Sequence, residues 1–279
     1  MPAIINTNLA SLNAQRNQAS SQLSMATSMQ RLSSGMRVNS AKDDAAGLAI
    51  AERMNTQVRG MTVAIRNAND GISLAQTAEG ALSKVGDALQ RMRELAVQGR
   101  NATNTTTDIG SLGKEFAELS KEIVRVTGGT TFNGKAILAA DSGTQTFQIG
   151  ANTTANDRVD VVTRDMTADA TITAVTGATF DDTTVGTDLD TIIQNIDLAL
   201  DTTNSERAVL GASQNRFDAV ISNLQISVEN QTAARSRIMD ADFASETANL
   251  SRAQILQQAG TAMISQANQQ PQQVLRLLQ

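Results

Sequence analysis

Two adjacent carboxylates, Asp43 and Asp44, form a pair that could do acid–base chemistry. Paired carboxylates divide the roles of general acid and general base when their surroundings drive their pKa values apart. The same side chains also stand just before a long apolar pattern, where Asp commonly caps the first turn of a helix and favours the positive end of its dipole. Capping is the stronger interpretation, because no other chemical group of the sequence is spaced to join the pair.

The composition excludes most other kinds of catalytic and metal-binding site. The chain has no His, Cys or Tyr among its 279 residues. It therefore lacks the usual general base near neutral pH, the commonest metal ligand, any thiol nucleophile and the two His of a zinc-protease motif. We expect no enzyme activity, no cofactor and no metal site. A net charge of −5 also argues against a nucleic-acid partner, which requires clustered Lys and Arg.

No segment has the pattern of a membrane or secretion signal. The first residues, "MPAIINTNLASLNAQR", lack a basic head followed by an apolar core, and no apolar run is long enough to cross a bilayer. We expect no membrane insertion. Taken alone, these features favour a soluble, intracellular protein.

Apolar residues at helical spacing mark both ends of the chain. They follow steps of three and four, or sums of these, which is the period of one helix face. In the first 40 residues the stripe contains Leu9, Leu12 and Leu23, and from 245 to 279 it contains Leu256, Met263, Val274 and Leu277. We interpret these residues as a polymerisation seam.

Long helices are predicted between the two terminal segments. The only prolines are Pro2 and Pro271, so no helix-breaking proline lies between these segments. One helix is expected from about 44 to 99, a shorter one around 112–126 that ends at Gly128 and Gly129, and another from about 188. Residues 137–187 are rich in Thr, Val, Asp and Gly, and runs such as "TFQIG", "RVDVV" and "ATITAV" predict short hairpins. Residues 232–250 are predicted to link the last long helix to the terminal one.

The fold class that follows is mainly α, a long coiled-coil or helical-bundle hairpin with a small β-rich middle. Residues 1–40 and 245–279 form one predicted domain, 41–136 and 188–244 a second, and 137–187 an outer region. We expect the two terminal helices to bury one apolar stripe each against the other. Sustained seven-residue repeats predict coiled-coil packing, and apolar surface left over for other copies predicts an open helical filament.

Three stretches resemble bacterial flagellin. They are "RLSSGMRVNSAKDDAAGLAIAERM" at 31–54, "RNANDGISLAQTAEGALSKVGDALQRMRELAVQ" at 66–98, and "ARSRIMDADFASETANLSRAQILQQAGTAMISQANQQPQQVLRLLQ" at 234–279. The resemblance implies secretion through the flagellar type III apparatus without a cleaved signal, polymerisation beneath a cap, and an extracellular flagellum filament. It further implies an export chaperone that covers the C-terminal region, a hook-junction neighbour, and terminal helices that form an inner tube.

The resemblance also implies recognition by host flagellin receptors. Gln90, Arg91 and Leu95, with Glu115, match the family's contact positions for the vertebrate Toll-like receptor. Residues 30–51, which begin at Gln30 and include Asp43 and Gly47, match the segment perceived by the plant receptor. The plainer interpretation of all these positions is subunit packing.

Three other functions compete with the filament subunit. A flagellar hook–filament junction protein has similar termini, but it should agree less well over "RELAVQ" and "ILQQAG". A membrane-surface amphipath should show Lys and Arg on its polar face, where this chain has Gln, Asn and Ser. An enzyme is the weakest alternative.

Overall fold

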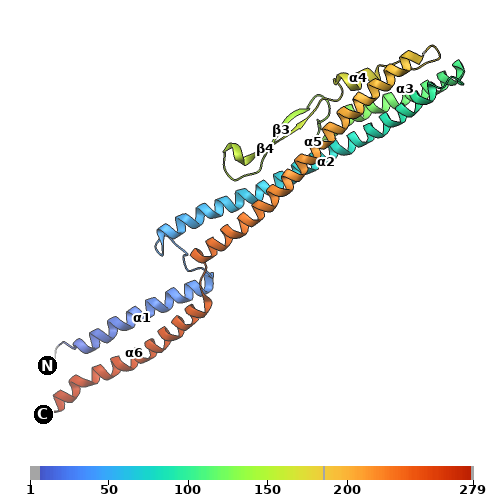
Figure 1. Ribbon diagram of the computed structural model, residues 1–279. Coiled ribbons are helices and arrows are strands. Elements are labelled where there is room, and N and C mark those ends of the chain that lie inside the picture. The colour runs from blue at the N-terminus through green and yellow to red at the C-terminus, as the bar shows by residue number, and fades with distance from the viewer. Residues whose placement is uncertain (1–6, 185, 278–279) are drawn as a thin grey trace. The chain divides into compact units, whose positions relative to one another are not determined.

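The computed structural model describes residues 7–184 and 186–277, with side chains as far as residue 269. The chain divides into two compact units, Met1–Thr56 with Glu229–Gln279 and Gln57–Val228. We call them the terminal unit and the bundle unit. Two long helices, α2 (Ala45–Gly99) and α5 (Gly186–Met239), contribute residues to both (Figure 1).

The bundle unit consists of α2 and α5 with the shorter α3 (Thr106–Gly129) beside them. The long helix predicted from 44 to 99 and the helix that ends at Gly128 and Gly129 are both confirmed. At the start of α3, the Thr105 hydroxyl accepts from the Asp108 backbone N–H while the Asp108 carboxylate accepts from Thr105 N at 2.9 Å. This reciprocal capping satisfies backbone donors that the first helical turn leaves free.

The core of the bundle unit is made of large apolar side chains from all three helices and from the strands. Phe217 of α5 is fully buried and meets Phe147 edge to face, with ring centroids 5.6 Å apart. Its ring lies against Gly71 of α2, where a Cβ atom would come within 2.6 Å of the ring. Gly71 therefore creates the space into which the aromatic ring fits.

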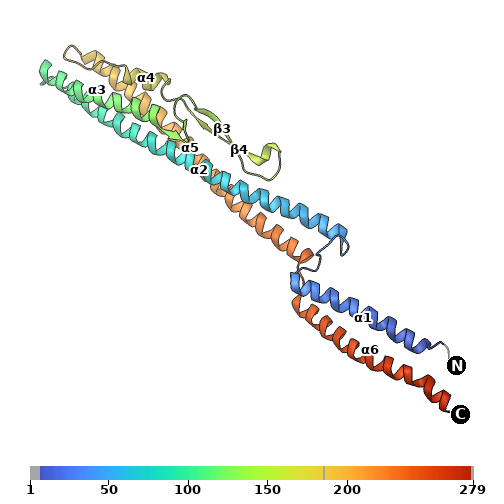
Figure 2. The same cartoon turned by 180° about the vertical axis from the view of Figure 1, so that it is seen from behind.

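Two hairpins and a short helix pack on the bundle. Strands β1 (Thr131–Phe132) and β2 (Lys135–Ala136) pair around a tight turn. Strand β3 (Gly143–Gln148) pairs antiparallel with β4 (Arg158–Thr163), and both are labelled in Figures 1 and 2. The hairpin predicted from "TFQIG" and "RVDVV" is thus confirmed. A single 3-10 turn, η1 (Ala155–Asp157), lies in its loop.

The β-rich prediction for "ATITAV" is wrong, because these residues form helix α4 (Ala170–Thr176). Asp169 caps the helix by accepting from the Thr171 backbone N–H at 2.9 Å. Ile172 and Val175 then lie three residues apart on the buried face. β-branched residues favour strands only weakly, so one cap and one packed face decide the local structure.

In the terminal unit, α1 (Leu9–Ser34) packs along α6 (Phe243–Leu277), and both views show the two helices side by side (Figures 1 and 2). The linker predicted at 232–250 is mostly helical, because α5 continues to Met239 and α6 begins at Phe243. Gly35 ends α1 with φ 70°, which favours glycine, and its carbonyl accepts from Ala241 N.

Candidate functional site

The interface between α1 and α6 uses small and polar residues. On α1, the buried or half-buried positions facing α6 step by threes and fours: Ser11, Ala14, Gln18, Ser21, Met25 and Ser28. The matching row on α6 is Glu246, Leu250, Ala253, Gln257, Gly260, Ile264 and Ala267. We call these two rows the inner seam. Small side chains allow helix axes to approach closely, so the seam contains little apolar area for two helices of this length.

The predicted apolar stripe of α1 lies outside this seam. Leu9, Leu12 and Leu23 are 65%, 54% and 72% exposed. The inner seam of α1 is displaced from this stripe by two positions, which is about 200° around a helix and turns the leucines away from the seam, although Leu23 still reaches the edge of the groove between the two helices. The expectation that the two terminal helices bury these leucines against each other is therefore wrong.

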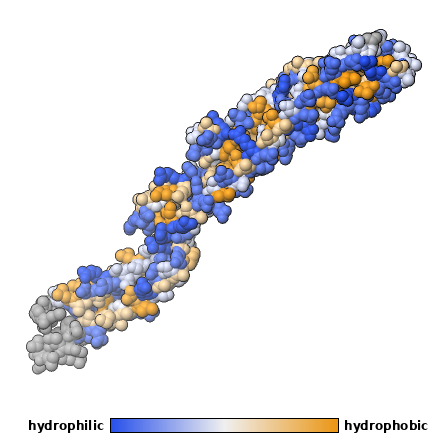
Figure 3. Space-filling view, in the orientation of Figure 1, coloured by the Kyte–Doolittle hydropathy of each residue, from blue (hydrophilic) through white to orange (hydrophobic). Residues whose placement is uncertain are grey.

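The stripe of α6 is displaced in a similar way. Leu256 and Met263 are 51% and 61% exposed, and each precedes by one residue a position of the inner seam. Val274 and Leu277, the other two residues of the predicted stripe, lie outside the described side chains. Figure 3 shows hydrophobic residues reaching the surface of this helix pair. We call the exposed Leu9, Leu12, Leu23, Leu256 and Met263 the outer stripe.

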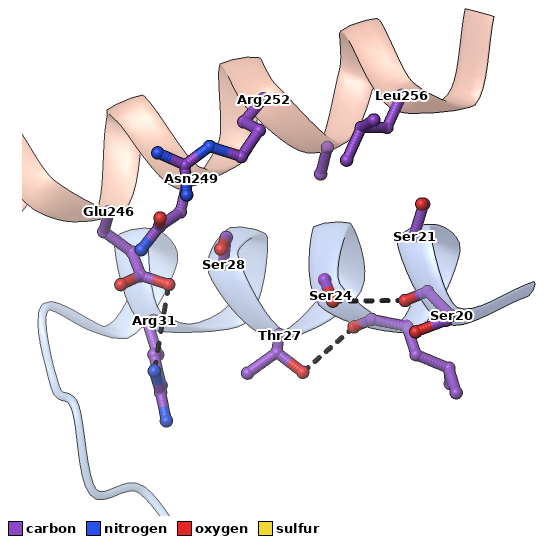
Figure 4. Close-up of a pocket in the computed structure, with 12 residues that line it drawn as sticks. Ser20, Ser21, Ser24, Thr27, Ser28, Arg31, Glu246, Asn249, Arg252 and Leu256 are labelled. Carbon is purple, nitrogen blue, oxygen red and sulfur yellow. Dashed lines mark hydrogen bonds and ion pairs between the residues drawn. The ribbon is translucent and has the colours of Figure 1, made fainter. Parts of the chain in front are cut away.

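A groove of about 560 Å³ runs between α1 and α6 (Figure 4). Hydroxyls line its α1 side, and several of them bond to their own helix: Ser24 donates to the Ser20 carbonyl at 3.1 Å and Thr27 to the Leu23 carbonyl at 3.0 Å. Leu23 and Leu256 lie at its walls. Because several of these hydroxyls already donate to their own helix, the groove offers shape and apolar edges. It is also lined by the charged Arg252, and it has a charged pair at one end.

That end holds Arg31 and Glu246, drawn with their ion pair in Figure 4. Arg31 Nη1 lies 3.9 Å from Glu246 Oε1, and the Glu246 residue is only 8% exposed. The buried Nε of Arg31 has no hydrogen-bond acceptor. Sequence analysis did not single out either residue. Glu246 falls on the inner seam of α6, whereas Arg31 lies three residues beyond Ser28, the last seam position of α1.

The carboxylate pair caps two successive turns. Asp44 accepts from Gly47 N at 2.8 Å, which identifies it as the N-cap of α2. Asp43 accepts from the Ser40 hydroxyl and from the Ser40 and Asn39 backbone N–H groups, and these bonds, the Ser40 hydroxyl first, lower its pKa. Both carboxylates are therefore occupied by hydrogen bonds within their own turn, as the capping interpretation predicts.

The residues matched to the plant-receptor segment differ in exposure. Gln30 and Asp43 are exposed, whereas Gly47 is buried in the terminal unit. A Cβ atom at Gly47 would lie 2.4 Å from Asp44 Oδ2, so glycine permits the capping bond there. Gly47 thus has a structural role that needs no receptor.

The residues matched to the Toll-like receptor also differ in exposure. Arg91 Nε donates to Glu115 Oε1 at 2.8 Å and Nη1 donates to Glu94 Oε2 at 2.9 Å, and these bonds raise the pKa of Arg91. Gln90, Arg91 and Glu115 are exposed and available to a partner. Leu95 is fully buried in the core. The folded bundle therefore does not present Leu95 on its surface beside Arg91.

The described residues contain no group of three or more Asp and Glu side chains placed to hold a metal ion. In the same part of the chain, no helix combines the length and the hydropathy needed to span a bilayer.

Comparison with known proteins identifies the family. Residues 5–146 match the bacterial flagellin N-terminal helical region, and residues 193–278 match the bacterial flagellin C-terminal helical region. Flagellin of Halalkalibacterium halodurans is 46% identical over 275 residues, covering 99% of each chain, and flagellin of Bacillus subtilis is 42% identical, covering 98% of this chain and 99% of that one.

Among solved structures, a putative flagellar hook-associated protein from Vibrio parahaemolyticus is similar in fold. It superposes with a TM-score of 0.62 at 13% identity, over 71% of this chain and 100% of that one. At this identity the likeness concerns the fold alone, so it does not favour the junction-protein alternative. The family matches extend over most of the chain and the relatives over nearly all of it, and the chain belongs to the bacterial flagellin family.

Proposed function

We propose that this chain is the structural subunit of a flagellar filament and that it polymerises through its paired terminal helices. The outer stripe supports this proposal most directly. Large apolar side chains that are more than half exposed on a helix pair are costly in water, and burial of each against a sister molecule would contribute about 1.5–3 kcal/mol. The filament is extracellular, and the chain would reach it by type III export.

Terminal truncations test the proposal. Chains lacking residues 1–40 or 245–279 should remain soluble and partly helical, because the core of the bundle unit lies within 57–228. They should sediment as monomers under conditions in which the full chain pellets as filaments visible by electron microscopy. Normal filaments from either truncated chain would refute assembly through the terminal helices.

The junction-protein alternative makes a different prediction. A filament subunit should elongate without limit on its own, whereas a junction protein should stop at short rings or remain monomeric. Filament length of the purified full chain, seeded with sheared fragments of itself, separates the two.

The outer stripe is also the surface on which we expect the secretion chaperone and the filament cap to act. Before assembly the exposed Leu256 and Met263 of α6 would be covered by a secretion chaperone, and at the tip the cap would guide each new subunit. We expect the double variant Leu256→Ala, Met263→Ala to bind the chaperone at least about tenfold more weakly. Val124→Ala, at an exposed position of the bundle unit, is the control.

Receptor recognition is proposed for the bundle surface. Gln90, Arg91 and Glu115 are exposed there, and an Arg with a fixed orientation is a common anchor of protein interfaces. Arg91→Ala should reduce signalling by a Toll-like-receptor reporter cell at least about tenfold. Lys121→Ala, an exposed and ion-paired position on α3, should leave signalling unchanged.

The remaining proposals concern functions that we expect the protein to lack. We propose that the protein is not an enzyme, requires no cofactor, binds no nucleic acid and inserts no segment into a membrane. The family is one of structural proteins, and the carboxylate pair that prompted the enzyme alternative is used in capping.

A further inference from the structure

Asn133 and Gly134 form the turn between β1 and β2, and they are the one Asn-Gly pair in the sequence. Phe132 pairs with Lys135, so the loop has two residues. The backbone φ is 48° at Asn133 and 80° at Gly134, and Asn133 is the one non-glycine residue with a positive φ in the described part of the chain. These values are typical of a type I′ turn, which favours Asn-Gly because its twist matches that of the strands.

The same pair can modify itself. Asn is a thermolabile residue, and a following glycine leaves its own backbone nitrogen accessible because it has no Cβ. The Gly134 nitrogen attacks Cγ of Asn133: an N–Cγ bond forms, the Cγ–Nδ2 bond breaks, and the amide group leaves as ammonia with the proton of the Gly134 N–H. Water then opens the five-membered imide. Cleavage of the new N–Cγ bond gives Asp, and cleavage of the original peptide bond gives isoaspartate, whose main chain runs through Cγ.

The folded turn prevents this attack. Ring closure requires the Gly134 nitrogen to be nearly eclipsed with Cβ of Asn133 about the Cα–C bond. A type I′ turn holds ψ of its first central residue at about +30°, which places that nitrogen nearly opposite Cβ. Both residues are exposed, and no atom of a more distant residue lies within 4 Å of where a Cβ on Gly134 would be. The protection therefore comes from backbone conformation and does not depend on exclusion of water.

Packing on both sides of the turn holds it closed. Phe132 is half-buried against the core, and Ile137 and Leu138, which follow β2, are almost fully buried. Ala136 N donates to Asp141 Oδ2 at 2.8 Å. Because each strand has two residues, these contacts rather than a long ladder of hydrogen bonds keep the hairpin paired. Such a short hairpin opens locally at less cost than the helices on which it packs.

We propose that Asn133 is a modification site controlled by this turn: it is unreactive while the β1–β2 hairpin is closed and is converted to Asp and isoaspartate when the hairpin opens. Isoaspartate adds one carbon to the main chain within a two-residue loop, so the pairing of Phe132 with Lys135 does not re-form. Each conversion to isoaspartate therefore leaves a permanent record of an opening. The inference goes beyond the proposed function and does not depend on filament assembly.

Mass spectrometry of the full-length chain tests the proposal. Two samples are kept in the same mildly alkaline buffer, one native and one unfolded in guanidinium chloride. Conversion of Asn133 is followed over time as a gain of one mass unit on the peptide that contains it, and isoaspartate is counted with a protein isoaspartate methyltransferase. We expect the native chain to react at least about tenfold more slowly than the unfolded chain. Equal rates in the two samples, or no reaction in guanidinium, would overturn the proposal.

Two variants test whether opening of the hairpin is the controlling step. Phe132→Ala keeps the Asn-Gly pair but removes the half-buried ring before it, so the native rate should rise at least about threefold while the rate in guanidinium stays the same. Lys135→Ala, the matched control, changes an exposed side chain on the other side of the turn and should leave both rates unchanged. An unchanged native rate for Phe132→Ala would contradict control by the turn.

A second asparagine distinguishes local opening from global unfolding. Asn204 precedes the small residue Ser205 within α5, and both are exposed, so conversion of Asn204 requires the long helix to unfold. In native Phe132→Ala, conversion should rise at Asn133 and stay at the wild-type level at Asn204. An equal rise at both positions would mean that the bundle unit unfolds as a whole and that the β1–β2 turn does not control the reaction.

Discussion

The bundle unit and the terminal unit pair their long helices with opposite kinds of residue. In the bundle unit the fully buried side chains include many large ones, among them Phe217, Leu82 and Met92. In the terminal unit the residues buried between α1 and α6 include Ser11, Ser28 and Ala253, while the leucines of the outer stripe are exposed. A unit that buries its large apolar side chains is complete within one chain. We expect a helix pair that exposes a row of leucines to be completed by other molecules.

Buried carboxylates are also paired more tightly in the bundle unit than in the terminal unit. In the bundle unit, Asp169 accepts from Thr171 N at 2.9 Å and from the Thr171 hydroxyl, and lies 2.6 Å from Arg164 Nη2. In the terminal unit, Glu246 is 3.9 Å from its countercharge. The opposite charges lie 2.6 Å apart in the bundle unit and 3.9 Å apart in the terminal unit, and the looser pair agrees with a terminal unit whose final environment includes further copies.

Removal of Phe217 should have the largest effect on folding. Phe217→Ala deletes a fully buried ring that contacts Phe147 and Gly71, and we expect it to lower the free energy of unfolding by about 3–5 kcal/mol. Urea titration of the full chain, followed by far-UV circular dichroism, measures the loss. Phe243→Ala is the matched control, since Phe243 in the terminal unit is 56% exposed. An equal cost for the two variants would break the comparison between the units.

A smaller loss is expected from filling the space at Gly71. Gly71→Ala places a methyl group 2.6 Å from Phe217 Cζ, and the overpacking should cost about 1–3 kcal/mol despite the better helix propensity of Ala. Gly80→Ala lies on the same helix with no atom within 4 Å of the new methyl group and should stabilise the chain by up to about 1 kcal/mol. Thermal unfolding of the two variants should therefore shift in opposite directions.

Acid should loosen α4 without affecting the terminal pair in the same way. Burial alone would raise the pKa of Asp169, but hydrogen bonds from Thr171 and the charge of Arg164 outweigh it and hold the pKa below 3.8. Because the folded pKa is lowered, the stabilisation is present above about pH 4 and is lost as the pH falls through the folded value. Hydrogen exchange in residues 165–176 should accelerate below that pH.

The variant Asp169→Asn provides the control for this pH dependence. It should exchange faster than the wild type at neutral pH, since it loses a charge-assisted network, and its exchange should change little between pH 5 and 3 beyond the intrinsic rate. If wild type and variant show the same acid dependence, another carboxylate is responsible.

The sequence predicts the elements of the fold well where one period persists over many residues. The 4–3 spacing in α2 and the apolar row of α3 identify both helices, and Gly128 with Gly129 marks the end of the second. The prediction of secondary structure fails where a few contacts determine the conformation of a short segment. Residues 170–175 have β-branched composition, but the Asp169 cap and the burial of Ile172 and Val175 make them helical.

The candidate site shows a different limit. Periodicity identifies an apolar row, but it does not state which neighbour covers that row. Leu23 and Leu95 both fit a helical stripe, yet one is 72% exposed and the other is fully buried. The intrachain contact of the terminal helices follows instead the inner seam, in which Ser, Ala, Gly and Gln outnumber large apolar residues such as Met25, Leu250 and Ile264. Its hydropathy signal is therefore weak, and it is recognised only when its seven-residue spacing is sought.

The smallest effect on folding and a large effect on assembly are expected from the same substitution. Leu23→Ala removes a side chain that is 72% exposed in the single chain, so the free energy of unfolding should change by less than about 0.5 kcal/mol. If a sister molecule buries Leu23, the loss of about 1.5–3 kcal/mol per contact should raise the critical concentration for polymerisation about tenfold to a hundredfold. Sedimentation of filaments over a concentration series measures it. Leu198→Ala, at a leucine of the bundle unit that is 55% exposed, shows whether exposure alone is sufficient. An equal rise for both variants would mean that the terminal stripe has no special role, whereas a rise confined to Leu23→Ala means that the outward leucines of α1 are the incomplete half of an interface.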